Sequence, residues 1–150
     1  MSTVTARARH AFPRLSAGQV YAAWTQPELV RQCMSLQLQG KDPAIALRRV
    51  EIDPVVGGKF VFSDSREGSE AWGYYRALER PGRIVFSWFV SPEEEEEDNS
   101  TVTLEIMPEG AGCVVAASHE MSDEWADYIA QTAEAWRSML EAIETALSGR

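Results

Sequence analysis

Alternation of apolar and polar residues predicts β-strands over most of this chain. The stretch Thr3–Phe12 alternates apolar positions with Thr and Arg, which is the period of a half-buried strand. Six later stretches show the same alternation, separated by short segments that contain Gly, Pro or acidic residues. They are Leu47–Asp53, Lys59–Asp64, Glu70–Leu78, Arg83–Val90, Ser100–Met107 and Cys113–His119. The short connections between them favour an antiparallel meander.

Two short helices are predicted between the first and second strands. Ser16 begins a capping-box pattern, which predicts a helix over Ala17–Thr25. Pro27 then fits the first turn of a second helix that ends near Met34. The stretch Ser35–Ala46 has no clear period and predicts a loop, which we interpret as a lid over any cavity.

The C-terminal segment changes to a helical period. Its apolar face consists of Trp125, Ile129, Thr132, Trp136, Leu140, Ile143 and Leu147. This spacing predicts one long amphipathic helix, with Ser122 able to cap its start and Gly149 its end. At about 1.5 Å per residue, such a helix extends roughly 39 Å, which is enough to cross a curved sheet.

These elements indicate an α+β fold in one domain, residues 1–150. A seven-stranded antiparallel sheet with one apolar face must bury that face. The C-terminal helix is the only predicted element long enough to do so. Because a single helix does not cover a wide curved sheet completely, we expect a gap beside it that could hold a ligand.

Composition excludes several other functions. The chain has 14 Lys and Arg against 23 Asp and Glu, a net charge of −9, so the clustered basic face of a nucleic-acid-binding protein is not expected. The run Glu93–Asp98 predicts a mobile, solvated loop, with recognition of a basic partner as the alternative. No apolar run is long enough for a membrane span. The lack of an N-terminal secretory pattern, with only two cysteines, predicts a reducing cytoplasm.

Large apolar side chains are predicted to gather between the sheet and the long helix. The expected ligand-binding walls are Phe60, Phe62, Tyr75, Phe86, Trp88, Val102, Leu104, Val115, Trp136 and Leu140. Small-molecule pockets have such walls, but a filled core needs the same residues, and the sequence leaves both open. His119 ends the last predicted strand. It is either a polar ligand anchor or a hydrogen-bonded structural histidine.

Neither a metal nor a cofactor is expected. His10, Cys33, Cys113 and His119 do not have the spacing of a metal site. If the first and last strands pair antiparallel, His10 and His119 lie at opposite ends of that pair. The sequence also contains no glycine-rich phosphate loop and no nucleophile elbow.

Six motifs occur in the order found in a known superfamily. They are Val20–Leu29 (VYAAWTQPEL), Asp53–Phe62 (DPVVGGKFVF), Gly73–Tyr75 with Arg83–Trp88 (RIVFSW), Ser100–Leu104 (STVTL), Gly112–His119 and Ala135–Leu140 (AWRSML). Together they cover nearly the whole chain, which resembles the START-like, or SRPBCC, superfamily. Within it, the chain is most similar to the branch named for homology to the activator of heat-shock protein 90 ATPase.

This resemblance implies a helix-grip fold, like that of the birch pollen allergen, with a hydrophobic cavity between the long helix and the sheet. Relatives bind lipids, sterols, polyketides or plant hormones, and a few are cyclases or ring-modifying enzymes. Our first hypothesis is a non-enzymatic protein that binds a small hydrophobic or amphipathic molecule. The alternatives are a cyclase or hydrolase that uses His119, assisted by Tyr75, and an interaction module of co-chaperone type, including a homodimer.

Overall fold

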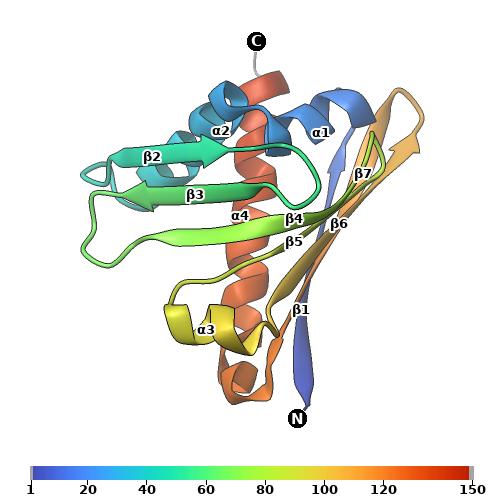
Figure 1. Ribbon diagram of the computed structural model, residues 1–150. Helices are drawn as coiled ribbons and strands as arrows, with labels where there is room; N and C mark the ends of the chain where they lie inside the picture. The colour runs from blue at the N-terminus through green and yellow to red at the C-terminus, as the bar shows by residue number, and fades with distance from the viewer. Residues whose placement is uncertain (1, 149–150) are drawn as a thin grey trace.

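The computed structural model describes residues 2–148, which contain one seven-stranded antiparallel sheet of order β1-β7-β6-β5-β4-β3-β2 (Figure 1). The strands are β1 (Thr3–Phe12), β2 (Leu47–Ile52), β3 (Lys59–Asp64), β4 (Ala71–Glu79), β5 (Arg83–Ser87), β6 (Thr101–Glu109) and β7 (Gly112–Ser122). The strands therefore confirm the predicted meander, apart from shifts of a few residues at their ends. The first strand pairs antiparallel with the last, so β1 and β2 form the two edges of the sheet.

The sheet is bent at its middle strands. The pairing of β4 with β5 shifts register between Tyr75 and Ala77, as a bulge does. β5 ends at Ser87, earlier than the predicted Val90, and beyond it only Phe89 bridges back to Trp72. The bend carries β2, β3 and β4 away from the β1 and β7 edge (Figure 1).

The first two helices follow strand β1, as predicted, but the second is longer. α1 (Ala17–Thr25) begins with the expected capping box at Ser16. α2 (Pro27–Lys41) continues through most of the stretch that was predicted to be a loop and lid. That prediction was wrong because tertiary contacts stabilise the extra turns. Leu38 is buried, and Gln37 Nε2 donates to the Ala135 carbonyl at 3.2 Å.

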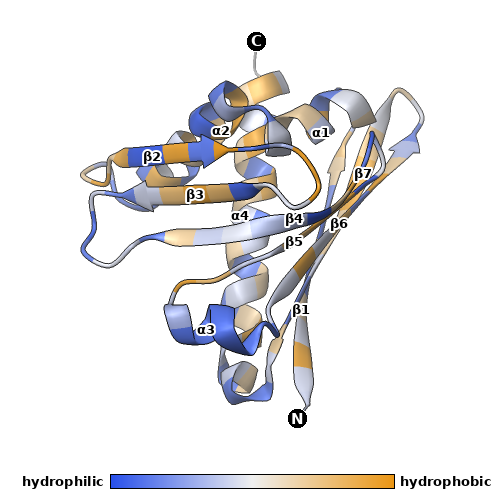
Figure 2. Ribbon diagram, viewed as in Figure 1, coloured by the Kyte–Doolittle hydropathy of each residue, from blue (hydrophilic) through white to orange (hydrophobic). Residues whose placement is uncertain are grey.

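The acidic run is also helical rather than a mobile loop. α3 (Pro92–Glu97) is capped by Ser91, whose side chain accepts from the Glu94 amide. Three of its glutamates, Glu93–Glu95, lie in the first turn, where the helix dipole favours negative charge. Glu95 anchors this hydrophilic helix to β4 by accepting from Trp72 Nε1 and Tyr74 Oη, both at 2.8 Å (Figure 2).

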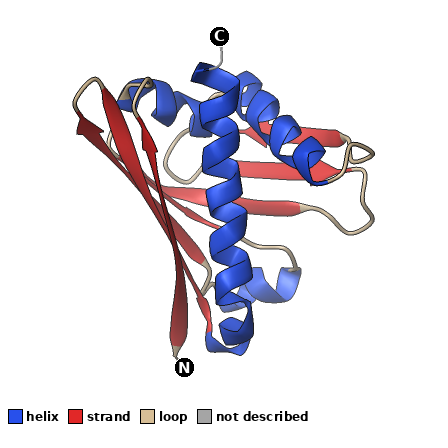
Figure 3. Ribbon diagram, turned by 180° about the vertical axis from the view of Figure 1, so that it is seen from behind, coloured by secondary structure: helices blue, strands red, loops and turns tan. Residues whose placement is uncertain are grey.

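The C-terminal helix begins later than predicted. Ser122 accepts from the Glu124 amide, but the turns that follow form a 3₁₀-helix, η1 (Asp123–Tyr128). Trp125 lies in this segment with non-helical dihedral angles of φ −96° and ψ 15°. The α-helix proper, α4 (Ile129–Ser148), crosses the sheet (Figure 3). The predicted cap Gly149 lies outside the described residues.

The core lies where α4 packs against β1 and β7. Leu140 and Ile143 from α4 are fully buried in one cluster with Leu104 and Val115. α2 packs beside α4 and extends the cover toward β2. No helix within residues 2–148 is long and apolar enough to cross a membrane.

A candidate ligand pocket beside the C-terminal helix

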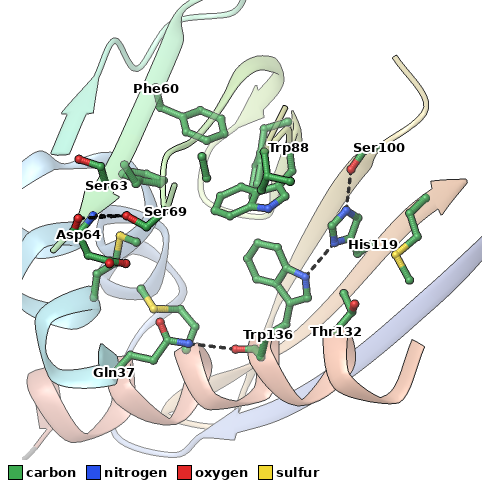
Figure 4. A pocket seen from close by; sticks show the side chains of 18 of the residues that line it. Gln37, Phe60, Ser63, Asp64, Ser69, Trp88, Ser100, His119, Thr132 and Trp136 are labelled. Atoms are coloured by element: carbon green, nitrogen blue, oxygen red, sulfur yellow. Dashed lines mark hydrogen bonds between the residues drawn. The ribbon is translucent and has the colours of Figure 1, made fainter. Parts of the chain in front are cut away.

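A pocket of about 550 Å³ lies between the β3–β5 part of the sheet and helices α2 and α4. Seven of the predicted site residues line it: Phe60, Phe62, Tyr75, Phe86, Trp88, His119 and Trp136. Phe60 and Trp88 from the sheet and Trp136 from α4 occupy its middle (Figure 4). The volume falls within the range of roughly 300–1,000 Å³ that is usual for small-molecule sites.

The other four predicted wall residues do not line this pocket. Val102, Leu104, Val115 and Leu140 are each fully buried in the core cluster. Their alternation pattern correctly placed them on the covered face of the sheet. However, they lie where α4 packs directly on the strands, so no space remains beside them. The pocket geometry therefore gives no support to the predicted ligand-binding role of these four residues.

The pocket wall is a network of packed aromatic rings. The ring of Trp88 stacks on that of Phe60, with centroids 5.9 Å apart, and meets the edge of Trp136 at 5.4 Å. Phe62 packs against Phe60 at 5.1 Å. These ring pairs have the spacing of favourable aromatic contacts, which fixes the wall before any ligand arrives. Trp88, Trp136 and Phe62 nevertheless stay only partly buried, because one side of each ring faces the pocket.

Several lining residues were not predicted. From the helices come Trp24, Met34, Gln37, Leu38 and Thr132, and from η1 come Trp125 and Tyr128. Val30, Met34 and Leu38 repeat every four residues along α2, a helical period that could have extended the predicted helix. Trp125 and Tyr128 are exposed at the rim and pack together with centroids 5.6 Å apart. No feature of the sequence placed η1 at the rim.

His119 is part of a buried hydrogen-bond network. Trp136 Nε1 donates to His119 Nδ1 at 3.1 Å, and His119 Nε2 lies 2.8 Å from Ser100 Oγ (Figure 4). An indole N–H can only donate, so Nδ1 must be the acceptor and the ring hydrogen resides on Nε2. The Nε2–H group then donates to Ser100. Both ring nitrogens are thus occupied by the protein.

Burial lowers the pKa of His119 to about 4, so the ring is neutral at pH 7. His119 is only 6% exposed, although its ring contributes to the pocket wall. Its geometry is that of a structural histidine that holds Trp136 and Ser100 in place. The register His10↔Val115 and Ala6↔His119 separates the two histidines by four residue pairs along the β1–β7 pair, which is less than the opposite ends expected from the sequence.

The opposite end of the pocket carries charge. Arg66 donates through Nε and Nη2 to both carboxylate oxygens of Asp64, at 2.9 and 2.7 Å. These bonds lower the pKa of the buried Asp64 carboxyl to about 2. Lys41 at the end of α2 also lines this side. The pocket therefore has an apolar middle, a charged end near Asp64 and a neutral polar end near Ser100 (Figure 4).

The sequence matches a family model over residues 14–148, and that family is described as Activator of Hsp90 ATPase homolog 1-like protein. The chain belongs to this family. It is therefore a member of the SRPBCC, or START-like, superfamily in its Aha1-like branch, as the motifs predicted. No match was found among curated proteins.

Solved structures agree with the fold. The Aha1 dimer from Colwellia psychrerythraea has a TM-score of 0.76 at 15% identity, with 96% of each chain covered. Protein NE0264 from Nitrosomonas europaea has a TM-score of 0.75 at 13% identity, covering 97% of this chain and 95% of that one. An AHSA1-like protein from Aeromonas hydrophila reaches 0.71 at 17% identity, covering 98% and 92%. These similarities confirm the helix-grip α+β architecture.

Proposed function

We propose that this protein binds a small hydrophobic or amphipathic molecule in the pocket between α4 and the β3–β5 part of the sheet. One observation carries the proposal. The half-buried rings of Phe62, Trp88 and Trp136 face a space of about 550 Å³ instead of packing into the closed core. Protein interiors are normally close-packed, so in a protein that binds nothing larger side chains would be expected to fill such a space. Burial of apolar ligand surface would supply the affinity, at about 25 cal/mol per Å² before the costs of association.

The proposal is tested by titration with N-phenyl-1-naphthylamine, an apolar probe that becomes fluorescent in apolar sites. We expect saturable binding to the native protein and at least a tenfold loss of affinity in Trp88→Ala, which removes the central ring of the wall. Trp72→Ala is the matched control, since Trp72 lies on β4, outside the pocket lining, and bonds to Glu95. Equal binding by the native protein and Trp88→Ala, with circular dichroism unchanged, would contradict the proposal.

A carried natural ligand can be sought independently. Native mass spectrometry of gently purified protein, compared with the denatured chain, should show an excess mass of a few hundred daltons. Extraction of that species would identify its chemical class. Because the ring network is preformed, we expect the excess to fall in Trp88→Ala and to persist in Trp72→Ala.

The alternative of a hydrolase or cyclase receives no support from the His119 geometry. A general base must present a lone pair to the hydroxyl that it deprotonates. Here the hydrogen on Nε2 faces Ser100, and the pKa of about 4 leaves His119 a weak base. The other proposed helper, Tyr75, is buried, which raises its pKa, and its hydroxyl points to the Trp24 carbonyl at 3.5 Å.

Assembly and location follow as secondary proposals. A solved relative from Colwellia psychrerythraea is a dimer, and we propose a homodimer for this chain as well. Light scattering coupled to size exclusion should give twice the chain mass, whereas a single chain mass would rule out the homodimer.

We also propose a cytoplasmic location. Both cysteines are buried, in support of a reducing cytoplasm.

A further inference from the structure

The polar end of the pocket contains a hydroxyl whose hydrogen has no acceptor among the residues that the structure describes. Ser100 is 7% exposed and lines the pocket directly before β6 begins. Within residues 2–148, its Oγ has a single hydrogen-bond partner, His119 Nε2 at 2.8 Å. Since Trp136 fixes the hydrogen on Nε2, this bond uses Ser100 Oγ as the acceptor. The Ser100 hydroxyl hydrogen therefore stays available to a molecule in the pocket.

The surroundings of Ser100 define the charge of a suitable acceptor. The nearest acidic lining residue in sequence is Glu94, whose carboxylate accepts from the Val90 amide at 3.0 Å. The basic lining residues Lys41 and Arg66 come from α2 and the β3–β4 connection, on the Asp64 side of the pocket. An anionic group at Ser100 would thus be buried without a neighbouring cation to offset its charge. A neutral oxygen meets no such penalty.

We propose that Ser100 donates a hydrogen bond to a neutral acceptor oxygen of the ligand, such as a ketone or ester carbonyl, and so selects oxygen-bearing apolar molecules over plain hydrocarbons. The inference rests on the proposed binding function and specifies the ligand class. The chain of donors from Trp136 through His119 to Ser100 orients this hydroxyl. His119 is then a positioning residue, and Ser100 takes the role of polar anchor that the sequence suggested for His119.

The test compares two probes of similar size that differ in one acceptor. 2-Acetylnaphthalene carries a ketone oxygen, whereas 2-isopropylnaphthalene carries none, and each is measured by displacement of N-phenyl-1-naphthylamine. Ser100→Ala should weaken binding of the ketone about five- to tenfold, the value of one neutral hydrogen bond, and change the hydrocarbon less than about twofold. Ser63→Ala, at the other end of the pocket (Figure 4), should leave both affinities within about twofold.

An infrared measurement on the native protein covers the case in which Ser100→Ala does not fold. The carbonyl stretch of bound 2-acetylnaphthalene should lie below its frequency in hexane, because a donated hydrogen bond weakens the C=O bond. A band at the hexane position, or equal weakening of both probes by Ser100→Ala, overturns the assignment of Ser100 while leaving the pocket intact. If neither probe binds the native protein, the proposed binding function itself is contradicted.

The charge of the acceptor is tested with 2-naphthoate. This anion should bind at least tenfold more weakly than the ketone, and tighter binding of the anion contradicts a neutral acceptor.

Discussion

The two halves of the sheet carry similar apolar residues, which form a closed core in one half and a pocket wall in the other. Under β1 and β7, α4 packs directly on the strands, and Val115, Leu140 and Ile143 are fully buried. In β3 and directly after β5, Phe62 and Trp88 are equally apolar but remain half-buried around a space of about 550 Å³. The difference arises because one straight helix follows only one half of a bent sheet. Hydrophobic character alone therefore does not distinguish a closed core from a binding wall.

The largest expected effect contrasts two Leu→Ala changes, one on each side of this division. Leu140→Ala should cost about 4 kcal/mol of unfolding free energy, because it leaves a cavity in close-packed surroundings. Leu38→Ala, in the pocket wall on α2, should cost about 2 kcal/mol, since Leu38 lacks neighbours on its pocket side. Urea denaturation measures both. Equal losses would show that the pocket is as tightly packed as the core.

Lowering the pH should reduce the free energy of unfolding through His119, which lies at the boundary of the two halves. Its pKa is about 4 when folded and 6.5 when unfolded, so the unfolded state binds more protons between these values. The stabilisation from neutral His119 is complete above pH 6.5 and decreases as pH falls to about 4, in total by about 3 kcal/mol at 1.36 kcal/mol per unit.

His119→Gln provides the reference for this pH measurement. The amide oxygen can accept from Trp136 and the amide nitrogen can donate to Ser100, but the side chain does not titrate. Unfolding free energies measured by urea from pH 7 to 4 should therefore fall more steeply in the native protein than in His119→Gln. The Asp64 carboxyl, with a pKa of about 2, loses its stabilising contribution only below pH 3.8 and stays outside this window. Parallel curves for the two proteins would contradict a buried neutral histidine.

The smallest expected effect concerns α3, which lies over the open half. Glu95→Ala removes the acceptor for Trp72 and Tyr74 and should cost about 1 kcal/mol, because these bonds are charge-assisted but only partly buried. Amide hydrogen exchange in α3 should accelerate with it. Glu96→Ala, at an exposed position of the same helix, should change stability by less than about 0.5 kcal/mol. If both variants behave alike, Glu95 does not anchor α3.

Local patterns predicted most elements of the fold, and the exceptions share a cause. The capping box at Ser16 and the alternation in β1, β3 and β6 depend on neighbouring residues, which the sequence displays directly. α2 extends past Met34 because Gln37 bonds to α4. α3 is held by Glu95, whose partners are more than twenty positions away. The local repeat of Val30, Met34 and Leu38 indicates the extension of α2, but the contacts that hold this extension and α3 come from distant parts of the chain.

The candidate site, like the fold, was predicted from the sequence only in part. Alternation along the strands identified the apolar face of the sheet, and the period of the C-terminal segment identified Trp136 and Leu140 as its cover. The sequence by itself thus determined the fold class, the family and the residues that face inward, because these follow from spacing and motif order. Only the tertiary structure decided that Trp136 borders a pocket while Leu140 is sealed, and that Ser100 rather than His119 has a hydrogen to offer. Those outcomes depend on how a straight helix lies on a bent sheet and on which donor reaches which nitrogen.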